Sequence, residues 1–385
     1  MKRRLVVVGS GQHFVSGISY YTSLLAQELS SNNDVSVVLL RRLIPRFLYP
    51  GKDRVGSEIM GPDLHHELPT FNGIDWTLVP SLWRALRFVR REAPEVIILQ
   101  WWSASALPAY LALARHARRN DLTIILELHE DLDTAEARIP IIGPLVKRGL
   151  RRLVRQAAAN VVHSEFDRER MITTLGLRPD RTFVIPHGPY EMALGGTRVE
   201  RSGVNTCRIL FFGTIRPYKG LEYLVQAFDR LPRENDNWHL TIVGETWEGW
   251  TVPFEHLELS PFQQDIEVVN RYVPDAELPD LFANADLVVL PYLRSSASGP
   301  LHLTMAAGLP VVLTRVGGLI DATEGYEGAV LVEPADITSL VEGVIAARAL
   351  VGKRFPDPRS WNETVTLYDQ VIEQAIQAGK SSAST

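Results

Sequence analysis

The stretch ADLVVLPYLRSSASGPLHLTMAAGLPVVLTRVGG, residues 285–318, predicts the fold of the second half of the chain. Two apolar runs within it, 287–291 and 310–314, have the length and the β-branched content of strands buried in a parallel sheet. A polar loop and a short helix, expected at 299–307, join the two runs. Because this loop leaves a parallel strand and opens a helix, it lies at the carboxyl edge of the sheet, where α/β folds bind ligands.

The start of this helix is predicted to bind an anion. Ser298 suits the N-cap, Gly299 lets a ligand approach the backbone, and Pro300 suits the first turn. The N–H groups of Gly299, Leu301 and His302 are then expected to point outward. We interpret the segment as one half of a diphosphate-binding site.

The composition of the chain indicates a soluble globular protein. Its 385 residues suffice for two domains, and 45% apolar with 22% charged residues is ordinary for folded proteins. A net charge of −5 gives no support for nucleic-acid binding. The single cysteine, Cys207, excludes an internal disulfide and is expected in the core or at a strand edge. The basic N-terminus has too short an apolar run for a signal peptide and no later run could span a membrane, so we expect a cytoplasmic protein, soluble or peripheral at the inner face of the membrane.

The first half of the chain alternates strand-like runs with helices, which predicts a doubly wound sheet. The expected strands are 5–8, 35–40, 95–100, 122–128, 160–163 and 182–185. The loop GSGQHFVSG after the first strand begins like a dinucleotide fingerprint, but Phe14 occupies the third-glycine position and disfavours a nicotinamide cofactor. Gly17, at the entrance of the next helix, is a candidate for close approach to a ligand. A glycine needed only for the turn is the alternative.

Two strand ends in this half carry candidate ligand-binding side chains. Trp101 and Trp102 follow one buried strand and can stack on an acceptor, with core packing as the alternative. His129 follows the next strand and suits contact with a phosphate or a hydroxyl group. Asp131 and Asp133 form a lone DxD pattern, which is too short to predict a metal site.

A basic amphipathic helix is predicted at 144–159, with Lys147, Arg148, Arg151, Arg152 and Arg155 on its polar surface. Such a helix can lie on an anionic lipid surface, where each basic residue adds about 1 kcal/mol. A solvated helix face is the alternative. The loop 41–54 mixes basic and large apolar residues, and is either an acceptor-binding loop that touches lipid or a packed surface loop.

Residues 191–204 lack periodicity and are interpreted as a linker, after which a second series of strands and helices begins. The loop GTIRPYKG, 213–220, joins a strand to a helix. Gly213 ends the strand, and Arg216 and Lys219 can converge beside the helix N-terminus, which predicts a second phosphate-binding element.

Three further features complete the second half. Glu245 follows the strand expected at 239–243 and lies at the same sheet edge. Val273, at the end of an edge strand expected at 267–273, can flank a nucleobase together with Tyr272. A last helix is expected near 360–377, followed by a disordered tail over 378–385.

Taken together, these motifs resemble family 4 of the glycosyltransferases. The resemblance is carried, in the family's order and spacing, by SGISYYTSLLAQEL (16–29), IPHG (185–188), FGTIRPYKGLEYLVQAF (212–228), the stretch 285–319 and GAVLVEPAD (328–336). It implies an α/β protein of the GT-B fold, with two Rossmann-like doubly wound domains facing across a cleft. The expected domains are 1–192 for the acceptor and 193–359 for the donor, with the helix near 360–377 returning to the first domain.

The resemblance also implies an activity: transfer of a hexose-type sugar from a UDP- or GDP-linked donor with retention of configuration, without a metal or other cofactor. Arg216 and Lys219 would stabilise the leaving diphosphate, and His129 would contact the sugar or a phosphate. The implied donor-binding residues are Gly17, Gly213, Glu245, Val273, Ser295, Ser298, Gly299, Pro300 and Leu301, with Trp101 and Trp102 as weaker acceptor candidates.

The sequence departs from the family pattern at three positions. The usual pair of glutamates, eight residues apart, falls on Ser295 and Leu303, and the common arginine after the first glycine is Thr214. Two alternatives therefore stay open: a non-catalytic nucleotide-sugar-binding or scaffold protein of the same fold, and a nucleotide-sugar epimerase. The acceptor can be a glycan, a lipid-linked intermediate or a small molecule. The basic helix favours cell-surface glycan or glycolipid assembly.

Overall fold

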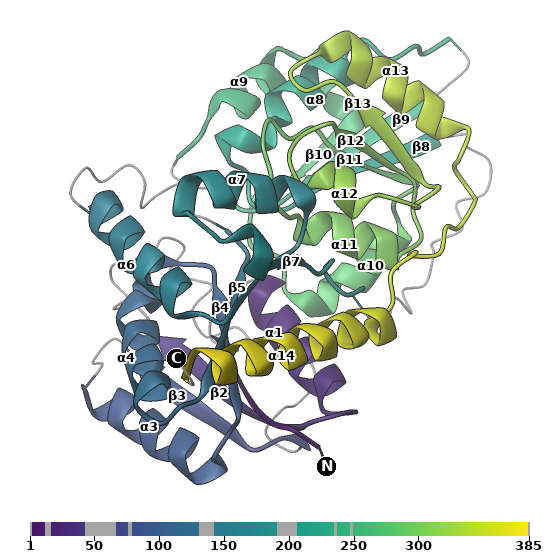
Figure 1. The fold of residues 1–385 in the computed structure, drawn as a ribbon. Coiled ribbons are helices and arrows are strands. Elements are labelled where there is room, and N and C mark those ends of the chain that lie inside the picture. The colour runs from purple at the N-terminus through teal and green to yellow at the C-terminus, as the bar shows by residue number, and fades with distance from the viewer. Residues whose placement is uncertain are drawn as a thin grey trace. The chain divides into compact units, whose positions relative to one another are not determined.

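The computed structural model describes residues 2–11, 17–42, 67–75, 79–130, 142–190, 206–234, 237–246 and 249–383. The chain separates into two compact units, of which unit 1 comprises Met1–Gly188 with Ser360–Thr385 and unit 2 comprises Pro189–Arg359. Each unit is an α/β domain (Figure 1). The predicted linker, the DxD pattern and most of the loop 41–54 lie outside the described residues.

Unit 1 is built on a parallel sheet with the strand order β3-β2-β1-β4-β5-β6-β7. Its strands are β1 (Arg4–Ser10), β2 (Asp34–Arg42), β3 (Thr70–Asp75), β4 (Val96–Trp101), β5 (Thr123–Leu128), β6 (Ala159–Val162) and β7 (Thr182–Val184). The edge strand β3 was not predicted, because its sequence TFNGID is only half buried and its asparagine and glycine interrupt the apolar pattern.

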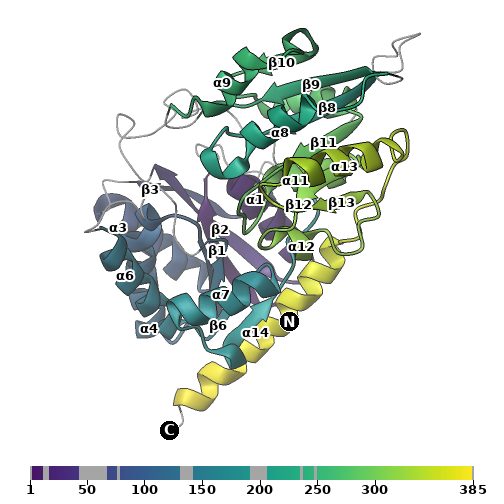
Figure 2. The same cartoon turned by 90° about the horizontal axis from the view of Figure 1, so that it is seen from above.

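Helices cover both faces of this sheet (Figure 2). They are α1 (Gly17–Leu29), α3 (Val79–Glu92), α4 (Leu107–Arg119), α6 (Ile142–Gln156), α7 (Glu165–Leu175) and α14 (Trp361–Ala383). Successive residues of a strand point to opposite faces. Accordingly, Val6 and Val8 of β1 pack with buried residues of α3, α4, α6 and α7, whereas Leu5 and Val7 pack with α1 and α14.

The C-terminal helix α14 belongs to unit 1, as expected. Trp361, Tyr368 and Ile372 lie in the same core as α1, and the hydroxyl groups of Tyr21 and Tyr368 are 3.3 Å apart. The predicted disordered tail is wrong in its first part, because α14 continues to Ala383. No proline interrupts this segment, and a helix anchored by packing propagates at little cost.

Unit 2 contains a second parallel sheet, with the strand order β10-β9-β8-β11-β12-β13. Its strands are β8 (Thr206–Phe212), β9 (Asn237–Val243), β10 (Ile266–Val269), β11 (Leu287–Leu290), β12 (Val311–Thr314) and β13 (Ala329–Val332). Its helices are α8 (Leu221–Phe228), α9 (Val252–Leu259), α10 (Leu278–Ala283), α11 (Gly299–Ala306), α12 (Leu319–Ala322) and α13 (Ile337–Arg348). Cys207 is buried in β8, as expected. The predicted edge strand is shorter than expected, so Val273 lies in the loop after β10.

Across the described residues, the structure contains no helix with the length and hydropathy that a membrane span requires.

Candidate functional site

The two predicted phosphate-binding segments meet in unit 2. The loop after β8 and the loop after β11 leave neighbouring strands at the carboxyl edge of the sheet. Gly213 has a φ of +121°, and a Cβ atom there would lie 3.1 Å from Cγ of Pro300 and 3.3 Å from Nζ of Lys219. The absence of a side chain at Gly213 thus lets the Lys219 ammonium group and the start of α11 approach the same point.

Lys219 is buried, and its surroundings favour the binding of an anionic ligand by its ammonium group. Its Nζ donates a hydrogen bond of 2.7 Å to the Tyr292 hydroxyl and lies 4.3 Å from the centre of that ring. Burial lowers the pKa of Lys219 to about 8, and the nearby positive charge of Arg216 also lowers it. Within the described part of the chain, no carboxylate forms an ion pair with Lys219. A desolvated ammonium group beside a second cation favours the binding of a negative group.

The start of α11 is capped as predicted, but it offers fewer free amides. Ser298 is the N-cap, and its Oγ accepts a hydrogen bond of 3.3 Å from the Leu301 amide. The His302 amide donates to the Ser298 carbonyl at 3.1 Å. The expectation that both amides point outward is therefore wrong. Gly299 is different, because no atom lies within 4 Å of the position that its Cβ would occupy. Its backbone is the accessible part of the helix start.

Tyr292 connects these elements and was missed by sequence reasoning. Its hydroxyl accepts from Lys219 and also from Ser298 Oγ at 3.3 Å. Burial raises the pKa of Tyr292 well above its usual value, so the hydroxyl stays neutral. We call Gly213, Lys219, Tyr292, Ser298 and Pro300 the Lys219 cluster. The position of Tyr292, directly after a buried strand and six residues before the cap, was the available signal.

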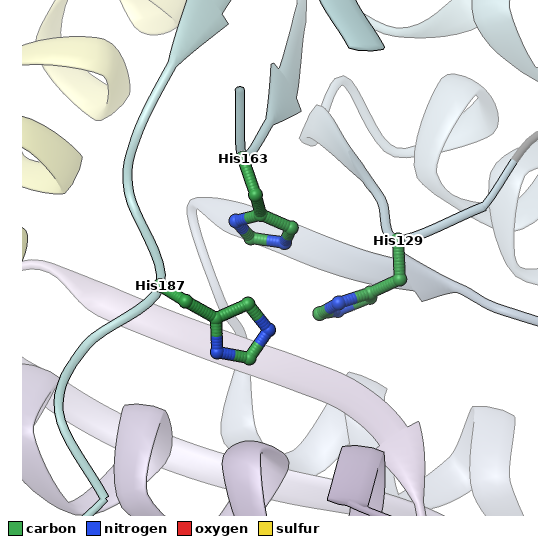
Figure 3. A group of neighbouring side chains, drawn as sticks. All are labelled: His129, His163 and His187. Carbon is green, nitrogen blue, oxygen red and sulfur yellow. The ribbon is translucent and has the colours of Figure 1, made fainter. Parts of the chain in front are cut away.

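A second group of polar side chains lies in unit 1, where three imidazoles converge (Figure 3). His129, His163 and His187 follow the neighbouring strands β5, β6 and β7, so the parallel sheet brings them together. The ring centres of His163 lie 4.6 Å from those of both His129 and His187. We call these three residues the histidine cluster. Sequence reasoning identified only His129.

The buried carboxylate of Glu127 lies beside the histidine cluster. Its Oε2 accepts a hydrogen bond of 3.0 Å from Gln100, and its Oε1 is 3.5 Å from Nε2 of His129 and 3.4 Å from Nε2 of His163. Burial lowers the pKa of His129 and favours the neutral ring. Burial alone would raise the pKa of Glu127, but the imidazoles and Gln100 outweigh it and lower the pKa, so Glu127 is a buried anion.

Comparison with known proteins identifies the family. A model described as "Glycosyl transferase 4-like domain" matches residues 16–188, and one described as "Glycosyl transferases group 1" matches residues 206–348. The chain belongs to the family 4 glycosyltransferases. The two models cover most of both units, so each half of this glycosyltransferase is matched independently.

Relatives and solved structures agree with the assignment. A D-inositol 3-phosphate glycosyltransferase of Geodermatophilus obscurus is 28% identical over 60% of this chain and 55% of its own length. An MMP alpha-(1->4)-mannosyltransferase of Mycolicibacterium hassiacum is 29% identical over 56% of this chain and 51% of its own length. The matched region thus spans about half of these relatives.

Solved structures show the GT-B fold of this glycosyltransferase. The Anabaena protein HepE in complex with UDP has a TM-score of 0.64 at 17% identity, covering 96% of this chain and 98% of that one. The catalytic domain of starch synthase IV from Arabidopsis thaliana, bound to ADP and acarbose, has a TM-score of 0.65 at 12% identity, covering 98% and 99%.

The remaining donor-side candidates of this glycosyltransferase follow strands of the same sheet. Partly buried Glu245 follows β9, and its carbonyl accepts a hydrogen bond of 2.9 Å from the Ile215 amide. Val273 is buried. Ser295 Oγ donates to the Ala297 carbonyl at 2.9 Å, and Leu303 is buried in α11. Neither position of the usual glutamate pair therefore supplies an acidic group.

The two tryptophans predicted to contact the acceptor, Trp101 and Trp102, differ in their burial. Trp101 is 1% exposed and packs in the core. The prediction that its ring stacks on an acceptor is therefore wrong. The strand β4 includes Trp101, and its buried face extends to that last residue. Trp102 is partly buried and packs against the same core. Gly17 is the first residue of α1, as predicted.

Proposed function

We propose that this glycosyltransferase transfers a hexose-type sugar from a UDP- or GDP-linked donor to an acceptor with retention of configuration, and that the transfer itself requires no metal or other cofactor. The observation that carries the proposal is the buried ammonium group of Lys219, held by Tyr292 beside Gly213 without a carboxylate partner among the described residues. The Anabaena protein of similar fold is described in complexes with UDP and with glucose, which supports a nucleoside diphosphate as the ligand.

The proposed chemistry makes specific demands on this site. Cleavage of the bond between the anomeric carbon and the diphosphate leaves a growing negative charge on the leaving oxygen. Lys219 and Arg216 supply positive charge, and the backbone at Gly299 lets the diphosphate approach the start of α11. A preorganised donor of this kind typically lowers the barrier by about 2.7–4 kcal/mol.

A panel of donors tests the proposal. Purified protein is incubated with UDP-, GDP- and ADP-linked hexoses, with and without a lipid or glycan extract as acceptor, and the released nucleotide and the products are measured. We expect one donor to yield nucleotide and a glycoside whose anomeric configuration is retained. Nucleotide binding without any turnover would favour a binding or scaffold protein, and conversion of the donor's sugar without an acceptor would favour an epimerase.

The affinity for nucleoside diphosphate is expected to fall as the pH rises above about 8. The pKa of Lys219 is lowered to about 8 in the free protein, so the ammonium form, which the diphosphate prefers, is complete only below that pH. Well above it, the loss approaches about tenfold per pH unit until the pKa of the bound state is reached. Calorimetric titration of UDP and GDP between pH 6.5 and 9.5 measures the effect. The same profile in Lys219→Ala would contradict the assignment of the titrating group.

We further propose that the acceptor is lipid-linked or membrane-proximal, as in cell-surface glycan or glycolipid assembly. The support is α6, which buries Val146 and Leu150 but exposes Arg148 and Arg152. Leu145 is 64% exposed and adds an apolar contact beside the basic residues.

Vesicle flotation tests the contact with membranes. We expect binding to vesicles that contain anionic lipid, weakened by salt, with about 1 kcal/mol lost for each basic residue removed. The variant replaces Arg148, Arg152 and Arg155 with alanine. The control removes the same charge from unit 2, at the exposed residues Arg230, Lys353 and Arg354. Equal loss in both variants, or no binding by the unmodified protein, would contradict a specific role for α6.

A further inference from the structure

The three side chains of the histidine cluster lie close enough together to act as ligands of one metal ion. One nitrogen atom from each of His129, His163 and His187 lies within 4.8 Å of the other two. All three side chains are buried at the carboxyl ends of adjacent strands. Figure 3 shows the rings entering the shared space from three different segments of backbone. The adjacent strands β5, β6 and β7 therefore bring the three histidines close to one another.

The hydrogen bonds of His163 determine which of its nitrogens faces this space. Its Nδ1 lies 3.0 Å from the Ile185 carbonyl, which can only accept, so Nδ1 carries the hydrogen. In a neutral ring, Nε2 then has a lone pair, and it lies 3.4 Å from the carboxylate oxygen Oε1 of Glu127. A cation bound between these two atoms or beside them would relieve the repulsion between their lone pairs. Histidine ligands of metals commonly donate their second N–H group to a backbone carbonyl in this way.

The charge around the cluster also favours a cation. Glu127 is fully buried, and within the described residues no lysine or arginine pairs with it. Its Oε1 and the Nε2 atoms of His129 and His163 make no hydrogen bond to any residue that the structure describes. A buried carboxylate without a lysine or arginine partner is costly, and a divalent ion beside it would offset that cost.

We propose that His129, His163 and His187 form a binding site for a divalent transition metal ion, of which Zn²⁺ fits best, with Glu127 as the neighbouring negative charge. Three imidazoles suit zinc, copper or nickel, whereas Mg²⁺ and Ca²⁺ prefer oxygen ligands. Zinc–imidazole bonds are about 2.0–2.1 Å long. A movement of each ring toward a common centre by about 1 Å or less is therefore enough to form these bonds. Side-chain rotation alone can supply a movement of this size.

The ion is proposed as a ligand of the histidine cluster and has no part in the transfer step. His129 is also the residue that the family resemblance implies as a contact to the sugar or phosphate. An ion bound to its imidazole would compete with that contact, so zinc would exclude transfer; this consequence alone rests on the proposed function. Metal binding itself is measured without any substrate, and its failure would leave the proposed function untouched.

The test uses the full chain, stripped of metal by a chelator and then passed into metal-free buffer. Zn²⁺ and Co²⁺ are added separately, the excess is removed by gel filtration, and bound metal is counted by mass spectrometry. We expect one ion per chain and, for Co²⁺, the intense visible absorption of a four-coordinate site that zinc displaces. His163→Ala and His187→Ala are each expected to weaken the affinity by at least about tenfold.

Two further variants make the result specific. His256→Ala changes a histidine on α9 in unit 2 and should bind metal like the unmodified protein. Glu127→Gln keeps the shape of the side chain, removes its charge and should weaken binding. Circular dichroism and melting confirm that each variant is folded, and glutamine is used instead of alanine at any of these histidines whose alanine variant is not folded. The proposal is overturned if the unmodified protein binds no more zinc than a folded variant that lacks both His163 and His187, or if cobalt gives only the weak spectrum of a hydrated surface ion.

Discussion

Replacing Lys219 with alanine is expected to lower kcat/KM for the nucleotide-sugar donor by about 100- to 1,000-fold, the effect of losing about 2.7–4 kcal/mol of charge stabilisation. The ammonium group is buried, donates to Tyr292 and lies 3.3 Å from the position of a Cβ atom at Gly213, and Pro300 of the other predicted phosphate-binding segment lies 3.1 Å from the same position. Its charge is the contribution that grows as the diphosphate leaves. Initial rates of nucleotide release measure the effect.

Two controls separate this role from a structural one. Lys353→Ala removes an exposed lysine from the same unit and should leave kcat/KM unchanged. Lys219→Met fills the buried space without a charge, so its melting temperature should stay close to that of the unmodified protein while its activity falls like that of Lys219→Ala. If either Lys219 variant is folded and turns over the donor at a normal rate, the Lys219 cluster is not the diphosphate site.

Alanine substitution of two glycines at the same site is expected to impair donor use in both cases but to lower stability in only one. Gly213→Ala introduces a Cβ atom 3.1 Å from Pro300 and 3.3 Å from Lys219 Nζ, at a backbone φ of +121°. Stability should fall by about 1–3 kcal/mol, and donor turnover should fall because the ammonium group is displaced. Gly299→Ala meets no atom within 4 Å and has no such strain, so the fold should be unaffected. Its new methyl group would occupy the space in which we propose that the diphosphate binds, and we expect at least tenfold weaker donor binding.

Gly352→Ala is the matched control for backbone strain. Gly352 has a φ of +87°, and no atom lies within 4 Å of the position that its Cβ would occupy. Alanine should therefore lower the stability through backbone strain alone and leave donor binding unchanged. Thermal melting and UDP or GDP titration of the three variants give the comparison. Unchanged ligand affinity in Gly299→Ala would show that no ligand approaches the start of α11 from this side.

Much of the fold could be predicted because parallel strands covered on both faces leave continuous apolar runs in the sequence. Strands such as β4 and β11 are buried along their whole length, and both runs are visible without a structure. The edge strand β3 has only its last two residues buried, so tertiary position determines its structure more than its sequence pattern does. The helical course of residues 378–383 depends in the same way on the anchoring of α14 in the core of unit 1.

The candidate site was predictable where a backbone motif defines it. Gly213 and the cap at Ser298 are positions where only particular residues suit the local geometry, and both lie where the sequence indicated. The partners of Lys219 were harder to identify, since Tyr292 is separated from it by 73 residues. The histidine cluster was missed for the same reason: its members follow three different strands, and only the sheet order places them together. Trp101 was predicted to contact a ligand but is buried in the core. The sequence shows where a strand ends but not how far burial extends along it.

The most direct test of the central claim, that the Lys219 cluster of this glycosyltransferase binds the diphosphate of a nucleotide sugar, is calorimetric titration of the purified protein with UDP, GDP and ADP at pH 7. We expect UDP, GDP or both to bind with one nucleotide per chain, and the folded Lys219→Ala variant to bind the same nucleotide at least tenfold more weakly. Binding of none of the three nucleotides, or equal affinity in the two proteins, would contradict it.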